Sequence, residues 1–185
     1  MDDSTMVNNV PTIKGSNFIL RSPKLSDIDD RLAVGKSREF VRMCGGDTRN
    51  MKPLTREQME GWHKRVCERE YDWIIEYKGR CIGGLKLTLD ESCDSAKYAV
   101  GIFDEAMLGK GIGTEATKLI LDYAFNKLRL REIRLRVLEY NKRAISCYKK
   151  AGFKVSEILY DNDKIEDKWE NDLIMTVTRA EFLKL

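Results

Sequence analysis

The sequence predicts an α/β (α+β) single domain built around one mixed β-sheet. Segments that alternate with a period of two and segments with helical periodicity follow each other in the order β, helices, three β, α, β, α, β, β. A chain of 185 residues, 42% hydrophobic and 34% charged, suits one domain with a substantial core. Since no repeat, linker or low-complexity block divides it, we expect a polar N-terminal tail over residues 1–15 and a single domain over residues 16–185.

Helix caps and turn residues predict where the helices and strands of the front half begin and end. Ser22 or Ser26 caps the first helix, and Thr55 caps a later one with an acidic first turn. The period then changes to two, with Gly79 as a hairpin turn residue. Gly101, inside a strand, predicts a bulge or the close approach of another backbone. The expected elements are a strand at residues 17–22, helices at 24–33, 37–43 and from Thr55 to about Cys67, and strands at 71–77, 81–89 and 96–103.

The back half alternates helices and strands. A helix follows the glycine-rich stretch that begins at Gly109, and Asn141 caps a second helix that Gly152 ends. The polar run at residues 161–164 predicts a turn between the last two strands. The expected elements are a helix from Ile112 to about Leu128, a strand at residues 132–138, a helix at 141–151, and strands at 153–160 and 169–178.

Composition and charge exclude several classes of function. A net charge of +3 without a long basic run argues against nucleic acid, and no apolar run is long enough to span a membrane. The acidic N-terminus does not resemble a secretory signal, so we expect a cytoplasmic protein. Five cysteines without a paired motif indicate reduced thiols. His63 is the only histidine, and we expect no metal site.

The stretch from Gly109 to Thr114 is expected to be an anion site. Three glycines, Gly109, Gly111 and Gly113, join a strand to a helix, and unpaired amides at a helix N-terminus readily bind phosphate. The spacing fits neither a P-loop nor a dinucleotide-binding loop. A tight strand-to-helix turn without a ligand is the alternative that this stretch alone leaves open.

A second stretch, residues 137–153, carries a further motif, and together with the glycine loop it points to a known family. Asn141, Ala144 and Tyr148 share one helix face, and Gly152-Phe153 follows. Together with the glycine loop, this pattern resembles the GCN5-related N-acetyltransferase (GNAT) superfamily over about residues 16–178. The front strand, Phe18 to Arg21, and the tail, residues 169–175, are similar to the branch of the RimJ/RimL ribosomal-protein and spermidine acetyltransferases.

The resemblance implies a fold and an activity. The expected sheet is mostly antiparallel, has about seven strands with a split between the fourth and fifth, and carries helices on both faces. Two positions depart from the superfamily pattern: Leu108 stands where Gln or Arg is common, and Asn171 where Asp is usual. The first loses a side-chain contact to the cofactor, and the second weakens any substrate role at that position.

The expected cofactor is acetyl-CoA. The glycine loop would hold its diphosphate, the strand edge at Ile102 would pair with its pantetheine arm, and the Phe103 amide would stabilise the oxyanion. By resemblance, Asn141 contacts the cofactor arm and Tyr148 protonates the leaving sulfur, although a core tyrosine remains an alternative. The residues expected to bind the cofactor are Ile102, Phe103, Gly109, Lys110, Gly111, Ile112, Gly113, Thr114, Asn141 and Arg143.

The acceptor side is less defined. Glu139 is our candidate general base, and the segment at residues 36–54, which holds Glu39 and Asp47, is the candidate mobile substrate lid. The expected acceptor is a primary amine, on a protein N-terminus, a polyamine, an aminoglycoside-like drug or an amino acid. A homodimer is among the expectations. The alternatives are a catalytically silent acyl-CoA sensor and a nucleotide-binding regulatory domain, of which the second is disfavoured by the loop spacing.

Overall fold

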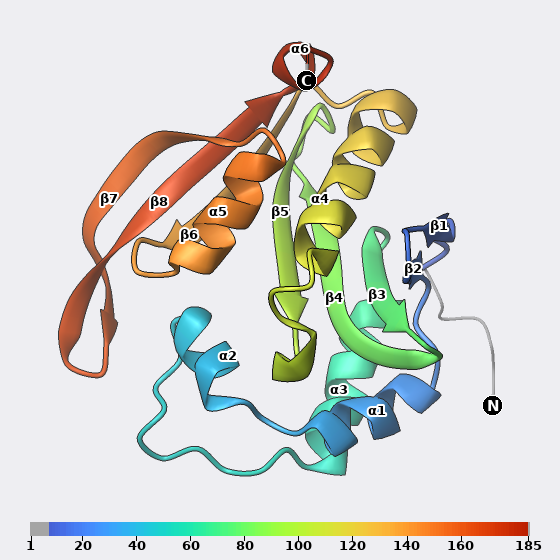
Figure 1. The fold of residues 1–185 in the computed structure, drawn as a ribbon, viewed down its shortest axis with the longest axis vertical. Coiled ribbons are helices and arrows are strands. Elements are labelled where there is room, and N and C mark those ends of the chain that lie inside the picture. Colours follow the sequence, from blue (N-terminus) through green and yellow to red (C-terminus); the bar gives the residue numbers. More distant parts are fainter. Residues whose placement is uncertain (1–7, 185) are drawn as a thin grey trace.

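One eight-stranded sheet organises the computed structural model, which describes residues 8–184 (Figure 1). The strand order is β1-β2-β3-β4-β5-β6-β8-β7. One strand more than expected is present because β1 pairs with β2 at the sheet edge. The strands are β1 (Ile13–Lys14), β2 (Ile19–Arg21), β3 (Asp72–Tyr77), β4 (Arg80–Leu89), β5 (Ser95–Ile102), β6 (Glu132–Leu138), β7 (Lys154–Ile165) and β8 (Lys168–Thr178).

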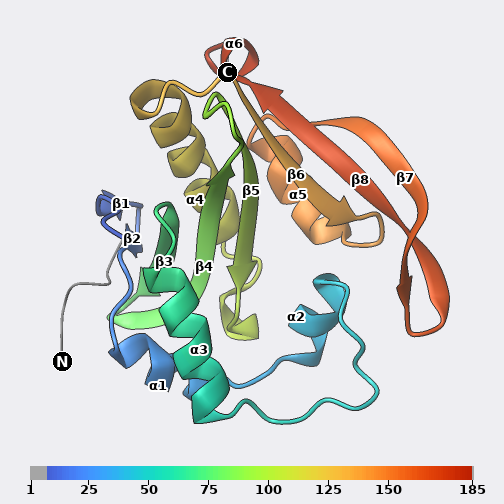
Figure 2. The same cartoon turned by 180° about the vertical axis from the view of Figure 1, so that it is seen from behind.

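The two halves of the sheet meet only at the start of β5 and β6. This is the parallel pair of the sheet, and it is formed by Ser95–Lys97 with Glu132–Arg134. Beyond it the strands diverge, as seen from behind in Figure 2. β5 and β6 are the fourth and fifth strands expected from the sequence, so the position of the split is confirmed. Every other pair of neighbouring strands is antiparallel.

Helices cover both faces of the sheet, as expected. α4 and α5 pack on one face and α1 and α3 on the other (Figures 1 and 2). None of the helices in the described part of the chain is long and apolar enough to cross a membrane. The helices are α1 (Ser26–Val34), α2 (Arg38–Met43), α3 (Arg56–Cys67), η1 (Glu105–Met107), α4 (Ile112–Asp122), which continues as a π-helical turn, η2 (Tyr123–Lys127), α5 (Lys142–Lys150) and α6 (Arg179–Phe182).

The main core lies between the sheet and the α4–α5 layer. Ile133 of β6 and Met175 of β8, together with Ala116 and Ile120 of α4, are completely buried there. A smaller cluster around Ile74 lies under α3. Because the main core spans both halves of the sheet, α4 and α5 hold the halves together where β5 and β6 no longer pair.

Part of the expected polar tail packs onto the domain. Asn8 is buried, and its Nδ2 donates to the Asp72 carbonyl at 2.7 Å. Val10 is buried in the main core. The tail from residue 8 onward is therefore anchored, because the Asn8 amide donates to backbone carbonyls of the domain. Residues 1–7 lie outside the described part of the chain.

The prediction of a turn at residues 161–164 was wrong. β7 runs through this stretch with a register irregularity between Leu159 and Asp163, and the hairpin turns at Glu166 and Asp167 instead. Both turn residues have positive φ, 47° and 70°. Such two-residue turns usually carry Asn or Gly, and Glu166 and Asp167 are neither, so the usual turn signal is absent from the sequence here.

Candidate active site

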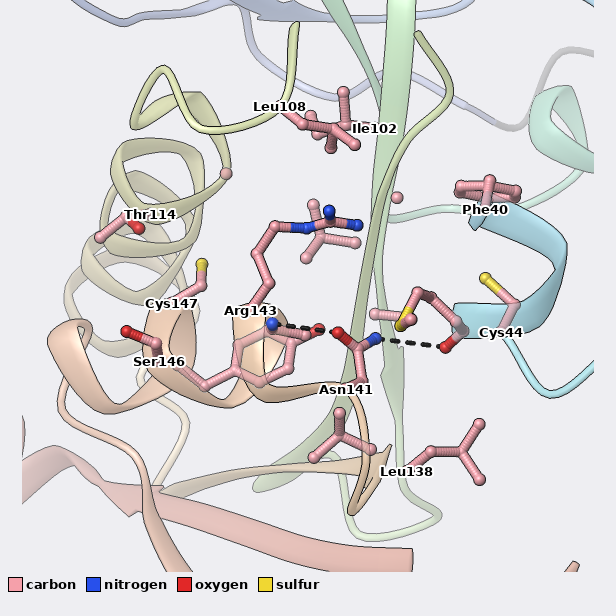
Figure 3. A pocket seen from close by; sticks show the side chains of 18 of the residues that line it. Phe40, Cys44, Ile102, Leu108, Thr114, Leu138, Asn141, Arg143, Ser146 and Cys147 are labelled. Atoms are coloured by element: carbon pink, nitrogen blue, oxygen red, sulfur yellow. Dashed lines mark hydrogen bonds between the residues drawn. The ribbon is translucent and has the colours of Figure 1, made fainter. Parts of the chain in front are cut away.

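A cavity of about 510 Å³ occupies the split. Its wall comes from β5, the glycine loop, α5 and the residues that end β6, and α2 lies across from them (Figure 3). Met43 and Asn141, which are 98 residues apart in the sequence, therefore meet at one place. Separation of β5 and β6 provides the space, since paired strands lie too close together to hold a ligand.

The glycine loop presents free backbone donors to this cavity. Gly109 and Gly111 have φ of 75° and 79°, which glycine adopts without strain. Gly111 caps α4, and Gly113 lies in its first turn. None of the amides of residues 109–114 donates to another described residue. The loop thus has the unpaired donors expected of an anion site, while Lys110 is exposed and does not line the cavity.

Strand β5 corrects the expected oxyanion donor. The Phe103 amide donates to the Ile82 carbonyl of β4 at 2.8 Å, so it is not free. Backbone groups of an antiparallel strand point alternately to its two sides. The amides of Val100 and Ile102 therefore face the split, where both residues line the cavity. The sequence therefore predicted the correct end of the strand, but the amide that faces the split is that of the preceding residue, Ile102, and not that of Phe103.

Tyr148 on α5 borders the cavity. Its ring is 7% exposed and packs edge-on against Tyr98 and Phe153, at centroid distances of 6.4 and 5.9 Å. Burial is the main reason that the pKa of its phenol is raised. The phenol therefore stays protonated across the physiological range. The two interpretations open from the sequence are compatible, because the ring belongs to the core while the residue lines the cavity.

Asn141 joins α5 to α2. Its Oδ1 accepts from the Ala144 amide at 3.1 Å, which is the expected helix cap, and its Nδ2 donates to the Met43 carbonyl at 3.2 Å (Figure 3). Arg143 lies beside the cavity, and its Nη1 is 3.5 Å from Glu39 Oε1 of α2. Both polar ends of the Asn141 side chain are therefore occupied by protein groups.

Glu139 is placed differently from the expectation. It does not line the cavity, and its Oε2 accepts from the Asn171 Nδ2 at 2.8 Å. The carboxylates that line the cavity are Glu105, Asp163 and Asp172. Asp172 was not singled out in the sequence because it ends a run of three consecutive polar residues near a hairpin, where a buried acid has no distinctive pattern.

Helix α2 closes the cavity opposite α5. Phe40, Met43 and Cys44 contribute lining side chains from the segment expected to be a lid. Gly101 explains how α2 comes so close: a Cβ there would lie 2.9 Å from the Phe40 ring. A close approach at Gly101 was expected, but the group that approaches is a side chain. All five cysteines are free thiols, and Cys44 and Cys147 line the cavity.

Comparison with known proteins agrees with this geometry. The family model for the acetyltransferase (GNAT) domain matches residues 17–154. The probable N-acetyltransferase YjcK of Bacillus subtilis (strain 168) is 28% identical over 177 residues, 89% of this chain and 96% of that protein. The spermidine N(1)-acetyltransferase of Escherichia coli (strain K12) is 30% identical over 117 residues, 63% of this chain and 62% of that protein.

A solved structure shows the same fold. The spermidine N-acetyltransferase from Vibrio cholerae, in complex with CoA and spermine, superposes with a TM-score of 0.75 at 19% identity, covering 91% of this chain and 99% of that one. The chain belongs to the GNAT family of acetyltransferases. It is an N-acetyltransferase, and the cofactor of this family is acetyl-CoA.

Proposed function

We propose that the enzyme transfers the acetyl group of acetyl-CoA directly to a primary amine. One observation carries the proposal: the cavity passes between β5 and β6, with unpaired amides of the glycine loop on one side and of β5 on the other. A thioester held there would be reached by an amine from the α2 side. Direct transfer then needs no covalent enzyme intermediate.

The cofactor would be held mainly by backbone groups. The amides from Gly109 to Thr114 and the N-terminus of α4 suit a diphosphate, and the free edge of β5 suits the amides of pantetheine. Arg143 is half-exposed and paired with Glu39 at only 3.5 Å, so it is available to a cofactor phosphate. We assign Asn141 to positioning α5 and α2, because its polar atoms are already bonded.

The chemical step uses two groups of this chain. The neutral amine attacks the thioester carbon, the developing oxyanion receives a hydrogen bond from the amide of Val100 or Ile102, and the C–S bond then breaks. Tyr148 donates its proton to the departing sulfur and takes one back from solvent, and the amide product releases its extra proton to solvent. We assign no side chain as general base, since the carboxylate of Glu139 is engaged by Asn171.

For the acceptor, we infer a small amine and a place in the RimJ/RimL-like branch. The front strand and the tail residues support the branch, and the relatives named for spermidine support the substrate class. Five free thiols suit a reducing compartment, and we propose a cytoplasmic location.

The test begins with binding. Thermal unfolding should shift upward with acetyl-CoA and not with ATP or NAD, because a ligand that binds only the folded state stabilises it. Thiol release should then follow with at least one member of a panel of polyamines, peptides and aminoglycosides. If acetyl-CoA binds and no primary amine in the panel releases thiol, direct transfer is contradicted and the acyl-CoA sensor is supported.

A further inference from the structure

The wall of the cavity contributed by β6 and β8 carries an acidic site. Leu138 of β6 pairs with Asp172 of β8, so their side chains share one face of the sheet. Both residues line the cavity. The opposite face, with Val137 and Leu173, belongs to the core under α5. Asp172 therefore lies on the face away from α5, on the side of α2.

Asp172 is a buried carboxylate with one open oxygen. It is only 1% exposed. Its Oδ2 accepts from the Asn162 Nδ2 at 2.7 Å and lies 3.5 Å from the Arg136 Nη1. Its Oδ1 accepts no hydrogen bond from any residue between 8 and 184. A buried carboxylate usually has its oxygens satisfied, so the free oxygen beside a cavity marks a place for a donor.

The charges around Asp172 favour a cationic donor. The Arg136 Nη2 donates to Asp163 Oδ2 at 3.2 Å, so one guanidinium lies between two carboxylates. These three side chains together carry one net negative charge. The contact of Arg136 to Asp172 is the longer of its two, and Arg136 itself is 54% exposed, so this cation can move toward solvent at little cost.

The site lies at the level of the reacting groups. The last paired residues of β5 and β6 are Lys97 and Arg134. Four residues further along each strand are Gly101 and Leu138, and Leu138 is the partner of Asp172. An amine bound at Asp172 is therefore on the same level of the split as the free amides of Val100 and Ile102.

We propose that Asp172 binds an ammonium group of a cationic acceptor through its open Oδ1, and that Arg136, which contacts Oδ2, moves toward solvent when the charge of the acceptor replaces its own. The proposal rests on the proposed function, because the cavity is taken to admit an amine. It assigns an acceptor class, amines with more than one positive charge. After an ammonium group has replaced Arg136 beside Asp172, the guanidinium of Arg136 keeps its hydrogen bond to Asp163.

Calorimetry tests the site without requiring turnover. Spermidine is titrated into the CoA-saturated protein and its Asp172→Asn variant. Loss of the charged acceptor atom should weaken binding about 10- to 100-fold. The matched control is Asp161→Asn, which removes a carboxylate from exposed β7 outside the cavity and should leave the affinity unchanged. Equal effects of both variants, or no binding by the unaltered protein, would overturn the proposal.

A variant with the opposite expected sign separates this role from misfolding. Arg136→Gln removes the competing cation and should strengthen spermidine binding severalfold, whereas damage to the fold would weaken it. Weaker binding by Arg136→Gln contradicts the exchange. The two proposals also fail differently: binding of spermidine with no thiol release from any amine of the panel contradicts acetyl transfer alone, while acetylation of a neutral amine without spermidine binding contradicts the Asp172 site alone.

Discussion

At the residue scale, the direction in which each amide or side chain points decided which of the predicted groups reach the cavity. Phe103 and Ile102 are neighbours in the sequence, but their amides point to opposite sides of β5, and the Phe103 amide is used by Ile82. Glu139 directly follows β6, yet its carboxylate is engaged by Asn171. One residue of register thus separates a free donor from a bonded one, and the sequence pattern alone did not resolve it.

Tyr148 offers the sharpest prediction at this scale. Tyr148→Phe keeps the packing of the ring against Tyr98 and Phe153 and removes only the hydroxyl. We expect kcat to fall about 10²- to 10⁴-fold, the usual contribution of a general acid, while CoA affinity stays the same. Steady-state kinetics and calorimetry measure the two quantities.

A matched control makes that result interpretable. Tyr77→Phe changes the same group on β3, outside the cavity, and should leave kcat unchanged. If Tyr148→Phe turns over a verified substrate as fast as the unaltered enzyme, another group protonates the sulfur.

At the element scale, the glycine loop and α4 follow from local physics. The sequence placed the loop, the start of α4 at Ile112 and the cap of α5 at Asn141, and the structure confirms all three. Each depends on residues close in the sequence. The turn of the β7–β8 hairpin was missed because its residues, Glu166 and Asp167, adopt positive φ without the usual Asn or Gly.

The glycines of the loop should respond differently to alanine. Gly111 has φ of 79° with open space around it, so Gly111→Ala costs conformational energy of about 1–2 kcal/mol. The melting temperature should fall by about 2–8 °C for a chain of this size, and CoA should bind more weakly. Thermal unfolding and calorimetry measure these effects.

Gly113 provides a control with the opposite expected effect on stability. It lies in the helix, where an added Cβ would meet only Cys147 Sγ at 3.8 Å. Gly113→Ala should therefore raise the stability by about 0.5 kcal/mol through its better helix propensity. A similar loss of stability in both variants would contradict the role assigned to the backbone angle of Gly111.

At the scale of the whole molecule, a segment from the front half bridges the split. The segment at residues 36–54 carries α2 and reaches the tip of the β7–β8 hairpin (Figure 1). The Thr48 amide donates to Glu166 Oε1 at 2.8 Å, and Arg49 pairs with Asp167. With Asn141 bonded to Met43, the expected lid is held at several points in this structure.

Hydrogen exchange can test which contact holds the segment. Glu166 has φ of 47°, so Glu166→Gly removes the carboxylate without backbone strain. Amide exchange at Thr48 should rise about tenfold or more, as expected for loss of a hydrogen bond to a charged group, while the urea midpoint of global unfolding changes little.

The neighbouring turn residue is the control. Asp167→Gly, at φ of 70°, removes only an exposed ion pair with Arg49, and such pairs contribute little. Thr48 should then exchange at nearly its original rate. Equal acceleration in both variants would attribute the effect to the turn itself and contradict the role of the Glu166 carboxylate.

The sequence by itself determined the class of fold and the glycine loop, because periodicity, caps and motifs depend on residues within a few positions of each other, and its resemblance to a known family supplied the position of the split. The tertiary structure decided which β5 amides are free, that Glu139 is engaged, and that Asp172 lines the cavity. These properties depend on strand direction and on contacts between segments far apart in the chain, which local patterns do not encode.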